Sequence, residues 1–148
     1  MTDDSLHVTL VFLGRREPAV ISAVWETVKS AVAALAPPAF VAREATWIPP
    51  RRPRLLAVGL EDREGRGAAV QGAVSGALVK ARLHEAEERP FWPHVTVARV
   101  RGRARVRGER PPAIAGNPFD APVLTLYRSD LHPAGARYVA LERLELGG

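Results

Sequence analysis

The stretch LHVTLVFL at residues 6–13 has a counterpart in PHVTVA at residues 93–98, and both carry the tripeptide His-Val-Thr. Each stretch is a short apolar run rich in β-branched residues, which predicts a β-strand. Successive side chains of a strand point to opposite faces, so the histidine and threonine of each tripeptide share a face. Brought together, the two tripeptides would place two titratable groups and two hydroxyl donors around one small anion. Such a set suits acid–base chemistry on a phosphate without a metal ion.

Histidine is scarce in this chain, which makes the repeated tripeptide informative. Four histidines are present, and two of them, His7 and His94, occupy the same place in the two tripeptides. A single His-x-Thr in a strand is usually a matter of packing. Two inward-facing copies call for a reason, because burying an imidazole without a partner is costly. The other two histidines, His84 at a helix end and His132 in a turn, are interpreted as surface or structural residues.

The composition fits one domain that uses no cysteine for structure or catalysis. The chain has 148 residues, of which 47% are hydrophobic and 25% charged, so we expect one domain or two small lobes that share a core. The absence of cysteine excludes disulfides, thiolate zinc sites and cysteine nucleophiles. No run of about 20 apolar residues predicts a membrane span, and no secretion signal is recognised. We therefore expect a cytoplasmic protein without a membrane partner.

The charge is basic and almost entirely arginine. The formal net charge is +5, and of 21 basic residues only Lys29 and Lys80 are lysine. The planar guanidinium of arginine suits phosphate oxygens, which favours an anionic partner, whereas a general drift of surface charge to arginine explains the same count. Arginines alternate after the second motif at Arg99, Arg101, Arg103, Arg105, Arg107 and Arg110. The distal ones are interpreted as a solvated edge that discourages aggregation, but Arg99, three residues after Thr96, is a candidate for the site.

Hydrophobic periodicity predicts an α+β protein with antiparallel sheets. Apolar residues at three- and four-residue steps from Val20 to Leu35 predict an amphipathic helix, which Pro37 and Pro38 end. A second helix is predicted from Glu64 to about Glu88, with several glycines in its first half. The predicted strands are residues 6–13, 40–48, 55–60, 93–98, 123–128 and 137–146, and the segment 101–118 reads as an exposed loop. Strands grouped in this way with short connections favour antiparallel pairing over a doubly wound parallel sheet.

A third segment completes a recognisable pattern near the C-terminus. It has the form Leu-x-x-Ser-x-Leu-x-x-x-Gly-x-x-Tyr-x-x-Leu, with Leu126, Ser129, Leu131, Gly135, Tyr138 and Leu141. With the two His-x-Thr motifs, the chain resembles the 2H phosphoesterase superfamily. Within it, the resemblance is strongest to the bacterial and archaeal RNA 2′,3′-cyclic phosphodiesterases, historically called 2′-5′ RNA ligases. The resemblance covers nearly the whole chain and implies a single bilobal domain over residues 1–148, with two antiparallel sheets lining a central groove and helices outside.

The resemblance also implies an activity, a mechanism and a substrate. The activity is hydrolysis of a 2′,3′-cyclic phosphate at an RNA end to a 2′-phosphate, without a metal or cofactor, and the reverse 2′-5′ ligation follows from microscopic reversibility. Carried over from the family, His7 is the acid that protonates the departing 3′ oxygen, and His94 is the base that activates water. Thr9 and Thr96 would donate to non-bridging phosphate oxygens. Phe12 would stack on the terminal base, and Arg99 would hold the phosphate or its neighbour.

One departure from the family pattern leaves alternatives open. Members of the family usually carry a strand and a helix before the first motif, whereas here residues 1–5 alone precede it. We therefore expect an exposed edge in the N-terminal lobe, through which the chain could associate with itself. The alternatives are an RNA-binding protein of the same fold without turnover, and a phosphodiesterase acting on a small cyclic nucleotide or ADP-ribose cyclic phosphate. RNA bound through many arginines should weaken steeply with salt, whereas a small nucleotide should not.

Overall fold

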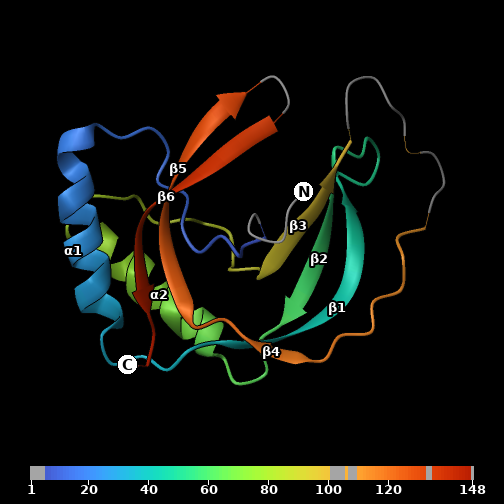
Figure 1. Cartoon of the computed structure of the whole chain (residues 1–148), viewed down its shortest axis with the longest axis horizontal. Coiled ribbons are helices and arrows are strands. Elements are labelled where there is room, and N and C mark those ends of the chain that lie inside the picture. The colour runs from blue at the N-terminus through green and yellow to red at the C-terminus, as the bar shows by residue number, and fades with distance from the viewer. Residues whose placement is uncertain (1–5, 101–105, 107–109, 133–134, 148) are drawn as a thin grey trace.

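The computed structural model describes residues 6–100, 106, 110–132 and 135–147. Two α-helices and six β-strands are formed by these described residues (Figure 1). The helices are α1 (Ile21–Val32), preceded by the 3₁₀ turn η2 (Pro18–Val20), and α2 (Arg66–Lys80). The strands are β1 (Ala39–Ile48), β2 (Leu55–Glu61), β3 (His94–Arg99), β4 (Pro118–Asp120), β5 (Val123–His132) and β6 (Gly135–Glu145).

The strands form two antiparallel sheets, which confirms the predicted α+β class. A four-stranded sheet has the order β3-β2-β1-β4, and β5 pairs with β6 in a second sheet. In Figure 1 the two helices lie beside the β5–β6 hairpin, and the curled four-stranded sheet occupies the other half of the molecule. No helix in the described part of the chain is long and apolar enough to cross a membrane. Self-association through an exposed edge of the N-terminal lobe stays a prediction.

The larger hydrophobic core joins the helices to the β5–β6 hairpin. The apolar stripe of α1 is buried as predicted, and it packs on α2 and on the ends of the hairpin because one face of each helix is apolar. The two helices contact each other directly. The buried members of this core are Val24, Trp25, Val28, Val32, Val70, Val74, Leu78, Leu124 and Leu146.

A smaller core lies in the four-stranded sheet and determines where the two His-Val-Thr tripeptides lie. Its buried members are Phe40 of β1 with Val58 and Leu60 of β2. Val8 and Val95, the central residues of the two tripeptides, pack against this cluster. Burying an aliphatic side chain stabilises a fold by about 1.5–3 kcal/mol. Both tripeptides are therefore held to the sheet by their valines.

Two predicted elements differ clearly from the structure. The strand predicted over residues 6–13 is wrong, because this run has a single β-bridge, at Val8, and no continuous ladder of hydrogen bonds among the described residues. The helix predicted to Glu88 ends at Lys80. Arg82 takes a left-handed φ of 58°, and Leu83 N–H donates to the Leu78 carbonyl at 2.8 Å, which closes the helix with a Schellman cap.

The remaining differences are smaller. The first helix begins with the 3₁₀ turn and ends at Val32 rather than Leu35. The short strand β4 falls at the end of the segment that was expected to be a loop, and pairs with the start of β1. The rest of the predicted loop, including Arg101, Arg103, Arg105 and Arg107, lies largely outside the described residues.

Replacing Gly67 by alanine is expected to destabilise the fold. A Cβ at this position in α2 would lie 2.6 and 2.7 Å from two ring carbons of Phe40, and overpacking of this kind costs about 1–3 kcal/mol. The matched control is Gly72→Ala in the same helix, where a Cβ would have no atom within 4 Å and alanine should stabilise by about 0.5–1 kcal/mol. Urea denaturation measures both. Equal stability of the two variants would contradict the close packing of α2 on Phe40.

Candidate functional site

One β-bridge brings the two tripeptides side by side. Val8 and Val95 pair in antiparallel fashion, so the two tripeptides run in opposite directions. Because both valines face the smaller core, the residues on either side of each valine point to the other face. Antiparallel pairing also sets each histidine across from the threonine of the other tripeptide. The result is a compact group of four functional side chains: His7 across from Thr96, and His94 across from Thr9.

Arg99 joins this face through an irregularity in β3. Strict alternation would put Arg99, three residues after Thr96, on the opposite face. However, the register of β3 on β2 shifts, so that Thr96 pairs with Ala57 whereas Arg99 pairs with Leu55. Ala57 and Leu55 are two residues apart and share a face, and residues directly opposite each other across a ladder point the same way. The bulge therefore returns Arg99 to the face of His94 and Thr96.

His94 is oriented by Trp92, two residues before it in the sequence. The Nδ1 atom of His94 lies 2.8 Å from the Trp92 carbonyl oxygen. A carbonyl only accepts hydrogen bonds, so Nδ1 carries the proton in this contact, and in the neutral ring Nε2 keeps its lone pair. The Trp92 indole stacks on the imidazole, with ring centroids 4.2 Å apart and planes 17° apart. The Trp92 indole also lies over Gly59, which is opposite His94 in the ladder: a Cβ there would lie 3.6 Å from Trp92 Nε1, in ordinary van der Waals contact.

His7 is packed against two tyrosines of the β5–β6 sheet. Its ring centroid lies 5.5 Å from that of Tyr127 in β5 and 4.6 Å from that of Tyr138 in β6, the second in an edge-on arrangement. The two tyrosine rings also contact each other, at 5.9 Å. Aromatic contacts of this kind restrict the orientation of a ring. The tyrosines were missed as site residues, although Tyr138 belongs to the C-terminal sequence pattern.

A cavity of about 1690 Å³ lies between residues 6–14, the helices and the β5–β6 hairpin. Three of the six predicted site residues line it: His7, Thr9 and Phe12. Phe12 is 73% exposed, so its ring is available to a ligand. His94, Thr96 and Arg99 do not line this cavity, and they connect to it through the Val8–Val95 bridge. Within the described residues, no group of three or more His, Asp or Glu side chains is arranged to hold a metal ion.

The chain is similar to several proteins of known structure. No family model and no curated protein matches the sequence. Among solved structures, TT0787 of Thermus thermophilus is 28% identical with a TM-score of 0.75, covering 97% of this chain and 79% of that chain. E. coli LigT complexed with 3′-AMP is 26% identical with a TM-score of 0.70, covering 98% of this chain and 79% of that chain. A third structure, described as a phosphoesterase, is 25% identical with a TM-score of 0.72, covering 97% and 78%.

These similarities, together with the paired motifs, define the class. The chain has the fold of the 2H phosphoesterase superfamily. Within that superfamily, its similarity is to LigT-like, or 2′-5′ RNA ligase, proteins. The relationship supports a phosphodiesterase-type activity.

Proposed function

We propose that this chain hydrolyses the 2′,3′-cyclic phosphate at an RNA end to a 2′-phosphate. The observation that carries the proposal is the Val8–Val95 bridge, which brings together two imidazoles and two hydroxyls from tripeptides that are 87 residues apart in sequence. The structure of E. coli LigT with 3′-AMP shows that a similar protein binds a phosphorylated nucleotide. Two ionisable side chains and two neutral donors beside each other are the groups that phosphate-ester hydrolysis needs.

The proposed reaction is a displacement at phosphorus. His94 Nε2 takes a proton from water, and the water oxygen forms a bond to phosphorus. The bond from phosphorus to the 3′ oxygen breaks, and His7 delivers a proton to that oxygen. The products are a 3′-hydroxyl and a 2′-phosphate. Imidazole as a residue type changes charge near neutral pH, so one neutral and one protonated ring can serve together.

The other residues would stabilise and position the substrate. Thr9 and Thr96 hydroxyls donate to the non-bridging phosphate oxygens, where negative charge builds up during attack. Arg99, on the same face, holds the phosphate or its neighbour through its guanidinium. Phe12 stacks on the terminal base, for which its exposed ring is suited.

The test is a product assay on a defined end. The purified chain is incubated with an oligoribonucleotide ending in a 2′,3′-cyclic phosphate, with a chelator present, and the product end is identified by mass spectrometry and by digestion with a 3′-phosphatase. We expect a 2′-phosphate, which resists a strictly 3′-specific phosphatase. A 3′-phosphate product would contradict the assignment of the leaving oxygen. Binding without turnover would replace the proposal with an RNA-binding protein of the same fold.

A further inference from the structure

We infer that one end of the four-stranded sheet is a binding surface for the RNA backbone several nucleotides upstream of the reacting end. The surface consists of Arg51, Arg52, Arg54 and Arg99 and is named the arginine tip. The inference rests on the proposed function, because it assigns the substrate class as a polynucleotide rather than a small cyclic nucleotide.

The arginine tip is held together by backbone contacts between two segments. The β1–β2 loop contains Arg51 and Arg52, and Arg54 directly precedes β2. The Arg54 carbonyl accepts a hydrogen bond of 2.8 Å from the Val100 N–H, and Arg99 pairs with Leu55. The loop and the end of β3 therefore lie together at one end of the sheet, as Figure 1 shows. Prolines flank Arg51 and Arg52 and restrict the backbone of the β1–β2 loop. The loop therefore loses less conformational entropy when it binds RNA.

The charge of the arginine tip is not neutralised within the described part of the chain. All four side chains are exposed, and no ion pair or hydrogen bond of their guanidinium groups occurs among the described residues. The sequence around them contains no aspartate or glutamate between Glu44 and Glu61, or between Glu88 and Glu109. A cluster of positive charges attracts a negatively charged partner.

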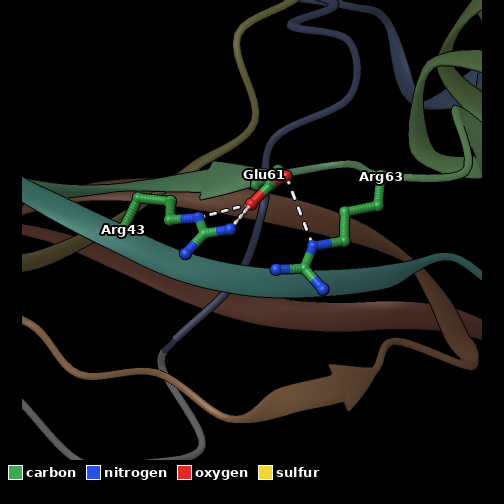
Figure 2. A network of polar contacts seen from close by, with 3 residues as sticks. All are labelled: Arg43, Glu61 and Arg63. Atoms are coloured by element: carbon green, nitrogen blue, oxygen red, sulfur yellow. Dashed lines mark hydrogen bonds and ion pairs between the residues drawn. The ribbon is translucent and has the colours of Figure 1, made fainter.

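The opposite end of the same strands shows the contrasting arrangement. There Arg43 and Arg63 both contact Glu61, Arg63 at 3.3 Å (Figure 2). Nearby, Arg66 pairs with Glu64. The hydrogen bond from Arg43, with the charges of Arg43 and Arg63, lowers the pKa of Glu61 below its ordinary value. Arginine therefore has acidic partners at that end of the sheet, while the arginine tip has none in the described residues. A uniform drift of surface charge to arginine does not explain this difference.

The position of the arginine tip relative to His94 sets the length of RNA that would reach it. His94 and Arg99 pair with Gly59 and Leu55, which are four residues apart in β2, a distance of about 13 Å at 3.3–3.4 Å per residue. A stacked nucleic-acid strand presents one phosphate per 3.4 Å of its axis, so about four nucleotides span this distance. Both residues are on the same face of the sheet, so a strand ending at His94 can extend along β3 to the arginine tip. A cyclic mononucleotide or dinucleotide at His94 would not reach Arg51, Arg52 or Arg54, which lie beyond Arg99.

The test compares two substrates and two triple variants. One substrate is a decaribonucleotide with a 5′ fluorophore and a 2′,3′-cyclic phosphate end, and the other is a dinucleotide with the same end. The test variant is Arg51→Gln/Arg52→Gln/Arg54→Gln. The matched control, Arg43→Gln/Arg63→Gln/Arg66→Gln, removes the same charge from the opposite end of the sheet. Thermal unfolding checks that both variants are folded.

The test variant should weaken binding of the decamer about 10- to 100-fold and reduce the slope of log K against log salt by about 2, since each single-strand phosphate contact contributes about 0.7. Turnover of the dinucleotide should be unchanged, and the control should bind the decamer within about threefold of the wild type. Equal effects of the two triple variants, or an unchanged slope, would overturn the inference. If no protein turns over either substrate, the proposed function fails, while decamer binding still tests the arginine tip.

Discussion

Replacing His94 by alanine should lower kcat for the cyclic phosphate about 10²- to 10⁴-fold, because a positioned general base contributes that much to a proton transfer. The Nε2 atom of this ring is available as a base, since Nδ1 is bonded to the Trp92 carbonyl. The same loss is expected for His7→Ala, which removes the acid. Single-turnover kinetics on the oligoribonucleotide measure the chemical step directly.

The control for both variants is His132→Ala. His132 is exposed in β5 and lies outside the paired tripeptides, so this variant should keep wild-type turnover. The double variant of His7 and His94 should be little slower than either single variant, because residues that act as one unit are not additive. Activity retained in either single variant, with folding intact, would rule out the two-histidine mechanism.

The second large effect is expected from the threonines. Thr9→Val and Thr96→Val keep the shape of the side chain but remove the hydroxyl donor. Each should lower kcat about 10²- to 10³-fold, as is found for the loss of one donor to a developing oxyanion. KM should change less, since the donated hydrogen bonds strengthen in the transition state.

Serine variants at Thr9 and Thr96 distinguish hydrogen-bond donation by the hydroxyl from packing of the methyl group. Thr9→Ser and Thr96→Ser restore the hydroxyl without the methyl group, so they should recover most of the activity that valine loses. Valine variants as active as the serine variants would show that the hydroxyls do not contact the reacting phosphate. Thr9 is exposed, so its substitution should leave the unfolding free energy within about 0.5 kcal/mol.

Much of the fold follows from local pattern. The four-residue spacing of Val24, Val28 and Val32 determines the buried face of α1 before any tertiary contact is known. The runs that become β1, β2, β5 and β6 are also readable from alternation and β-branched content. The predicted end of α2 was wrong because a left-handed residue at Arg82 stops it, and no glycine in the sequence indicates that turn.

Part of the candidate site can be predicted from the sequence, and part depends on the tertiary structure. The sequence alone identifies the chemical groups: two imidazoles and two hydroxyls in paired tripeptides, with an aromatic ring and an arginine nearby. It did not determine that residues 6–13 contact β3 through one bridge rather than a full strand ladder. It also did not determine which face Arg99 occupies, or that Trp92 orients His94.

The sequence predicts some features and not others because the interactions differ in how far apart their partners are along the chain. Backbone propensity and hydrophobic periodicity act over a few residues, so they can be read along the chain. The Val8–Val95 contact, the bulge in β3 and the stacking of Trp92 on His94 over Gly59 depend on segments that only packing brings together. One extra residue in a strand reverses the face of every side chain beyond it, and only the neighbouring strand shows where that residue lies.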